Sequence, residues 1–171
     1  YRILSATDDA LFAARIVVTR SGEVEAFCRE RKIPVLLHAM PYRNHTVHLG
    51  LSALLKEYPE LAGCMFALGD QPLLTKETLE AMVITFSQYY QTASPIFRLA
   101  AIAEDDSIIP GNPILFGNRY FEELLTLPDN RPAICMSALM VPFSSISSNG
   151  YTCFIIPKLS TPFASARKSG S

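Results

Sequence analysis

One short stretch of the sequence combines a carboxylate with residues that turn a chain sharply. Gly69-Asp70-Gln71-Pro72 follows the apolar run 64–68 and precedes Thr75, where a helix is expected to begin. In open α/β sheets, ligands bind beyond the carboxyl ends of the strands, so a carboxylate at this place points toward a site. Asp70 is therefore the strongest functional candidate, for contact with a metal or a nucleotide. The alternative is that Asp70 caps the helix near Thr75.

Other side chains suited to binding lie on both sides of this stretch. Arg43 presents a planar fork that fits phosphate oxygens, although an exposed surface arginine is equally plausible. His38, His45 and His48 could form a metal cluster, and His45 and His48 would share a helix face, but no third ligand has matching spacing, so no zinc site is predicted. His45 then lies in a loop that faces a substrate, or in solvent. Gly111 and Asn112 either allow a close backbone approach to a ligand or form a plain Pro-Gly-Asn-Pro turn.

Short apolar runs alternate with amphipathic stretches along the first half of the chain. This alternation indicates a parallel sheet with crossover helices on its faces, and hence an α/β fold. Ser21 and Thr75 are the expected caps of two of these helices. The expected strands are 15–19, 34–38, 65–68 and 94–103, with a further apolar stretch at 108–116; the expected helices are 3–13, 23–31, 47–58, 75–87 and 119–127.

The length and composition predict one globular domain over residues 1–171, with small molecules as its expected partners. The 15 basic and 16 acidic residues give a net charge of −1, so electrostatics supports neither a nucleic-acid nor a membrane partner. No apolar window reaches the length of a membrane span. The four cysteines are widely spaced, and Cys28 and Cys64 lie in apolar patterns, so we expect buried, reduced thiols and a cytoplasmic protein.

Three motifs at characteristic spacing resemble the MobA-like nucleotidyltransferases. They are Gly69-Asp70-Gln71-Pro72, the Gly-x-Pro-x-x-Phe pattern of 111–116, and the aromatic helical segment 121–124. The segment 43–54 is similar to a helix start of the same family. The likeness spans residues 15–127 and is closest to the molybdenum cofactor cytidylyltransferase branch, whose members join CMP from CTP to molybdopterin.

This resemblance implies a three-layer Rossmann-like fold with a mostly parallel sheet. It implies that Asp70 holds the Mg²⁺ that bridges the nucleotide phosphates, a role that suits a hard, oxygen-seeking cation. A phosphate of the acceptor would then attack, and pyrophosphate would leave. Nucleoside triphosphate and a molybdopterin-type phosphate are the expected partners. The candidate substrate contacts are Gly69, Gln71, Arg43, His45, Gly111 and Asn112, with turn formation as the alternative for Gln71.

The sequence also departs from the family pattern. The Gly-rich loop with which family members begin, which cradles the triphosphate, has no counterpart in this chain, so we expect a sheet that is incomplete at the amino terminus. The segment 158–162 lacks the carboxylates of the family's D-x-D-T-P-E motif, and 158–171 is expected to be a flexible tail. Two alternatives therefore stand beside cytidylyl transfer to molybdopterin. One is transfer to another acceptor, such as a sugar phosphate; the other is an inactive copy that binds a partner or self-associates, with a homo-oligomer as a possible assembly.

Overall fold

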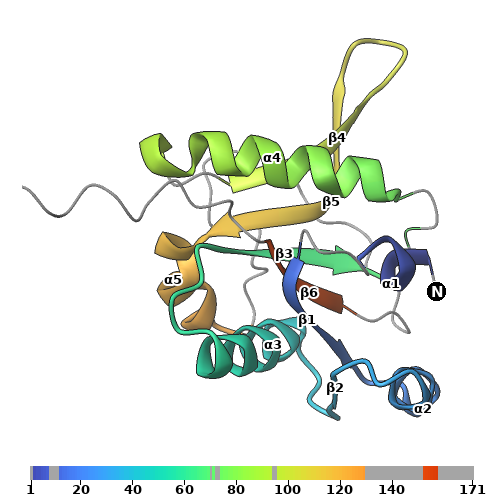
Figure 1. Ribbon diagram of the computed structural model, residues 1–171. Coiled ribbons are helices and arrows are strands. Elements are labelled where there is room, and N and C mark those ends of the chain that lie inside the picture. Colours follow the sequence, from blue (N-terminus) through green and yellow to red (C-terminus); the bar gives the residue numbers. More distant parts are fainter. Residues whose placement is uncertain are drawn as a thin grey trace, which may run out of the picture.

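A six-stranded sheet with helices on both faces forms the framework of the protein (Figure 1). The computed structural model describes residues 2–7, 12–69, 71, 74–93, 96–129 and 152–157. In chain order the elements are α1 (Arg2–Ala6), β1 (Phe12–Thr19), α2 (Gly22–Glu30), β2 (Val35–Leu37), α3 (Arg43–Glu57), β3 (Gly63–Leu68), α4 (Lys76–Ala93), β4 (Ile96–Ile102), β5 (Ile108–Gly117), the 3₁₀ turn η1 (Asn118–Tyr120), α5 (Phe121–Leu125) and β6 (Thr152–Pro157).

The sheet is mixed, with strand order β2-β1-β6-β3-β5-β4. β1 pairs in parallel with β2, while β6 runs antiparallel to both of its neighbours, β1 and β3. β5 is antiparallel to β3 and to β4. Strands β2, β1, β3 and β4 therefore point the same way. We call the end of the sheet at which Thr19, Leu37 and Leu68 terminate β1, β2 and β3 the carboxyl edge.

Side chains alternate across the strands and divide the core into two layers. Val17 and Met65 belong to a cluster that packs against α1, α2 and α4, whereas the adjacent residues Val18 and Cys64 pack against α3 and α5 on the other face. This arrangement confirms the predicted α/β class with helices on both faces. Cys28 and Cys64 are buried free thiols, as expected, and burial raises the pKa of the Cys28 thiol.

Two helix starts follow from local capping. Ser21 Oγ accepts a hydrogen bond from the Val24 amide at 3.4 Å and caps α2. At α4, the Thr78 amide donates to Thr75 Oγ1 at 3.3 Å. Each hydroxyl satisfies a backbone donor that a helix leaves unpaired at its first turn. Both caps were predicted, although α4 continues to Ala93, six residues beyond its expected end at Ser87.

Other predicted boundaries were wrong. α3 begins at Arg43 and not near Val47, because its first turn is held by a distant segment: Asn44 Nδ2 donates to the carbonyl oxygen of Pro128 at 2.6 Å. The expected helix 119–127 is shorter, with a 3₁₀ turn before α5. The helix expected at 3–13 is confined to α1, and Phe12 begins β1. The expected tail, 158–171, lies outside the described residues.

Candidate functional site

The two stretches that carry the sequence motifs meet at the carboxyl edge. Phe66 of β3 pairs with Ile114 of β5, so the residues that precede Ile114 lie near the carboxyl end of β3. There, Gln71 Nε2 donates a hydrogen bond to the carbonyl oxygen of Asn112 at 2.9 Å. A backbone group of β5 and a side chain that follows β3, forty-one residues apart, are thereby held in one place.

The Pro-Gly-Asn-Pro stretch lies within β5, so the predicted alternative of a plain turn is wrong. The pairing of β4 with β5 is irregular here, between Arg98 and Ala100. Arg98 Nε donates to the carbonyl oxygen of Gly111 at 2.8 Å, and the peptide bond that follows this carbonyl group's own, Asn112-Pro113, is cis. The carbonyl groups of Gly111 and Asn112 are therefore fixed from opposite sides by two side chains. We call Gln71, Arg98, Gly111 and Asn112 the junction.

The central predicted residue, Asp70, lies outside the described residues, as do Pro72 and its successor Leu73. Its two neighbours are described: Gly69 follows the last residue of β3, and Gln71 is partly buried. The Gln71 Oε1 atom is buried and accepts no hydrogen bond from the described part of the chain. A buried amide oxygen without a donor is costly, so this atom marks a position where a ligand group would be favoured.

A second group of polar side chains lies where β1 and β2 end. His38 follows β2, and its Nε2 atom is 3.0 Å from Thr46 Oγ1 in the first turns of α3. Burial lowers the pKa of His38, and the positive charge of Arg20 and the proximity of His45 lower it further. The lowered pKa favours the neutral form of the imidazole. The sequence analysis weighed His38 only as a metal ligand beside His45 and His48, and it did not identify Arg20.

His45 lies in the first turn of α3 and is neither in a loop nor fully in solvent. Its Nε2 atom is 3.3 Å from Asp129 Oδ1, and its side chain is 24% exposed. Its ring meets that of His48 edge to face, with centroids 6.5 Å apart. Arg43, the neighbouring candidate, is exposed. Within the described ranges, no three histidine, cysteine or acidic side chains are grouped so that they can hold a metal ion.

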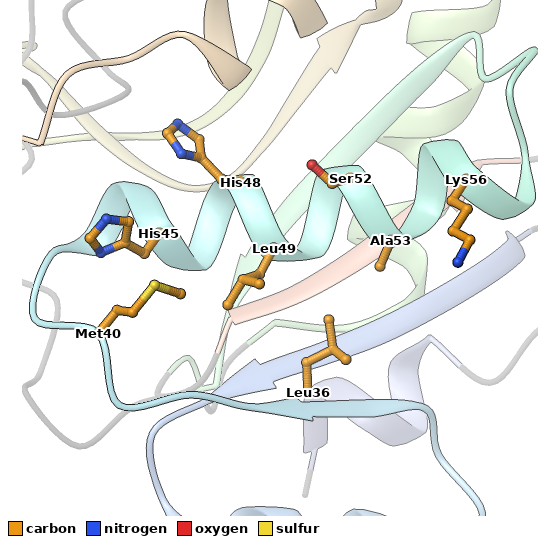
Figure 2. A pocket seen from close by; sticks show the side chains of 8 residues that line it. All are labelled: Leu36, Met40, His45, His48, Leu49, Ser52, Ala53 and Lys56. Carbon is orange, nitrogen blue, oxygen red and sulfur yellow. The ribbon is translucent and has the colours of Figure 1, made fainter.

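An open groove of about 460 Å³ runs along α3 from this histidine pair (Figure 2). Figure 2 shows Leu49 and Ala53 pointing from α3 toward Leu36 of β2, with Met40 beside His45 and Lys56 near the other end of the helix. The lining is mostly apolar: Leu36, Met40, His45, His48, Leu49, Ser52, Ala53 and Lys56. Gln71 is not part of it, so the groove and the junction are separate features.

Comparison with known families decides the identity. A family model described as the MobA-like NTP transferase domain matches residues 1–140. The chain belongs to this family. Searches of the curated proteins and of the solved structures each found no match.

Membership makes the chain a nucleotidyltransferase domain, as the motif spacing predicted, and nucleoside triphosphates are the substrates of such domains. The match covers both motif stretches that meet at the junction. Among the described helices of this transferase, none is long and apolar enough to cross a membrane.

Proposed function

We propose that this MobA-like transferase joins CMP from CTP to a phosphate of a molybdopterin-type acceptor, with Mg²⁺ as cofactor, in the cytoplasm. The supporting observation is the hydrogen bond from Gln71 to the backbone of Asn112, which brings the Gly-Asp-Gln-Pro stretch to the Gly-Asn-Pro stretch at the carboxyl edge. In open α/β sheets this edge is where ligands bind. The spacing of the two stretches resembles the cytidylyltransferase branch of the family.

In the proposed reaction, an oxygen of the acceptor phosphate attacks the α-phosphorus of CTP. The new phosphorus–oxygen bond forms as the bond between the α-phosphorus and the bridging oxygen breaks, and pyrophosphate leaves with that electron pair. Such transfers depend mainly on positioning and on electrostatic stabilisation. The described residues would contribute position: the fixed backbone of Gly111 and Asn112 would line the acceptor side, and Arg43 and His45 would contact phosphate groups.

One oxygen atom at the junction, the buried Oε1 of Gln71, suits Mg²⁺, which prefers oxygen ligands. Asp70, its neighbour in the sequence, carries a carboxylate, which is a ligand of the same kind. In this proposal Asp70 holds the ion, which would neutralise charge on the triphosphate during transfer. Gly69 would allow the nucleotide to approach the backbone closely at the end of β3.

Release of pyrophosphate from CTP, with molybdopterin as acceptor and Mg²⁺ present, tests the proposal. Asp70→Asn removes the negative charge with little change in size, and we expect it to abolish release. The matched control is Asp106→Asn in the exposed turn after β4, where asparagine tolerates the positive φ of 62°. Full activity of Asp70→Asn would contradict the proposal. Release with a sugar phosphate in place of molybdopterin would assign a different acceptor.

A further inference from the structure

The hairpin of β4 and β5 projects beyond α4 as a two-stranded arm (Figure 1). Its apolar side chains are unusually exposed: Ile102 is 77% exposed, Ile108 is 73% exposed and Ile109 is 54% exposed. Single exposed apolar residues are common, but a group of three large ones on one projecting ribbon is typical of an interaction surface. We call residues 99–109 the arm.

One side of the arm is an open strand edge. β4 is the last strand of the sheet, and β5 is its only neighbour among the described strands. The Ala103 amide donates to the Ser107 carbonyl at 2.9 Å, so the backbone groups of Ala103 point toward β5. Because these groups alternate along an antiparallel strand, those of Ala100 and Ile102 point outward. An open edge of this kind is a template for pairing with another strand.

We infer that the arm is a self-association element, in which β4 pairs antiparallel with β4 of a second copy about a twofold axis at Ala101. This register places Ala100 opposite Ile102 of the second copy, so both sets of outward backbone groups are satisfied. Ile102 pairs with Ile108 within each copy, so this register would form a row of apolar side chains that runs across both copies. On the other face, Ala101 and its partner Ile109 form the equivalent row.

Charge selects the same register. An axis at Ala101 places Arg98 beside the turn of the second copy, which carries Glu104, and the reverse contact follows by symmetry. An axis at Ala100 would instead place Arg98 opposite Ile102, leaving the charge beside an apolar side chain. Burial already lowers the pKa of Arg98, so a carboxylate nearby would stabilise its charged form. Opposite charges across an antiparallel pair are favourable, whereas like charges are unfavourable.

The chemistry of the arm favours a second copy over an anionic membrane surface. The turn at its tip carries Glu104, Asp105 and Asp106, which anionic headgroups would repel. A symmetric pairing is also self-complementary, because each copy offers the same edge and the same charge pair. The occupant that fits both the edge and the charges is therefore another copy of this chain.

Sedimentation velocity of the full chain over about a hundredfold range of concentration tests the inference. We expect the wild-type protein to shift from monomer to dimer. Ile102→Lys places a charge in the apolar row and Glu104→Arg brings two like charges close together, and each change is expected to weaken association at least about tenfold. Thermal melting should confirm that both variants remain folded, since both sites are exposed.

Ile84→Lys is the matched control, because Ile84 is an exposed isoleucine on α4, outside the proposed interface. It should leave association unchanged. A wild-type protein that stays monomeric over the whole range would overturn the inference. So would a dimer that Ile102→Lys and Glu104→Arg leave as tight as the wild type, since the contact would then lie elsewhere.

Discussion

The two halves of β5 have opposite surroundings. The inner half, Ile114–Gly117, is buried between β3 and β4, and its side chains pack in both core layers. The outer half, at Ile108 and Ile109, is exposed and pairs with β4 alone among the strands that the structure describes. The junction, where Gln71 and Arg98 hold the backbone, lies between them. The candidate site thus lies where the buried part of β5 ends and its exposed part begins.

The largest expected effect comes from truncating one side chain in each half of β5 and comparing the two losses of stability. Leu115 is fully buried, so Leu115→Ala removes apolar contacts and leaves a cavity, and we expect the free energy of unfolding to fall by about 2–5 kcal/mol. Ile109→Ala, on the exposed half, should change it by less than about 0.5 kcal/mol. Urea unfolding measures both values. Similar losses for the two variants would show that the arm is packed as firmly as the core.

A change in β3 tests how tightly the inner half is packed from its other side. A Cβ atom added at Gly63 would lie 2.6 Å from Phe86 Cζ and 2.9 Å from the carbonyl oxygen of Phe116. Gly63→Ala should therefore destabilise the protein by about 1–3 kcal/mol in urea unfolding, because the backbone oxygen cannot move aside easily. Gly22→Ala is the control, since nothing lies within 4 Å of the added atom. Equal stability of the two variants would contradict this packing.

At the junction, the expected effect is on activity more than on stability. Gln71→Leu removes the hydrogen bond to Asn112, which should lower the free energy of unfolding by about 0.5–1.5 kcal/mol. Pyrophosphate release should fall by about tenfold or more, because the two motif stretches lose their fixed relation. Gln88→Leu, at an exposed position of α4, makes the same chemical change elsewhere and should alter neither quantity. Unchanged release in Gln71→Leu would separate the junction from catalysis.

The smallest expected effect is a pH dependence of stability that comes from His38, which follows β2 at the carboxyl edge. Burial lowers the pKa of His38 in the folded state, so below pH 6.5 the unfolded chain binds more protons at this residue than the folded protein does. The contribution of His38 to stability is therefore complete above pH 6.5 and decreases as the pH falls below it. His38→Gln should make urea midpoints less dependent on pH between about 5 and 7. A pH dependence identical to that of the wild type would contradict the assignment.

The sequence predicted the features that depend on neighbours in the chain. The caps at Ser21 and Thr75 act over three residues. The apolar run before Gly69 forms a strand, as its own residue types predicted. The start of α3 was predicted four residues too late because Asn44 is held by Pro128, which lies eighty-four residues away. The pairing of β6 between β1 and β3 depends on contacts at still longer range.

The candidate site divides in the same way. The motif spacing identified Gln71, Gly111 and Asn112 as candidates, and the structure brings them together at the junction. Arg98 was not identified and His38 was weighed only as a metal ligand, because their partners are a backbone carbonyl across the sheet and a hydroxyl on another element. Their roles, like that of Asp70, remain predictions.

Thermal melting with nucleotide tests the central claim most directly, because a ligand that binds only the folded state must raise its stability. We predict that CTP with Mg²⁺, at concentrations well above Kd, raises the Tm of the wild-type protein by several degrees, and by more than GTP does. Asp70→Asn should lose most of this rise, while Asp106→Asn should keep it. No rise with either nucleotide at millimolar concentration, or an equal rise in Asp70→Asn, would contradict a nucleotide site at the carboxyl edge.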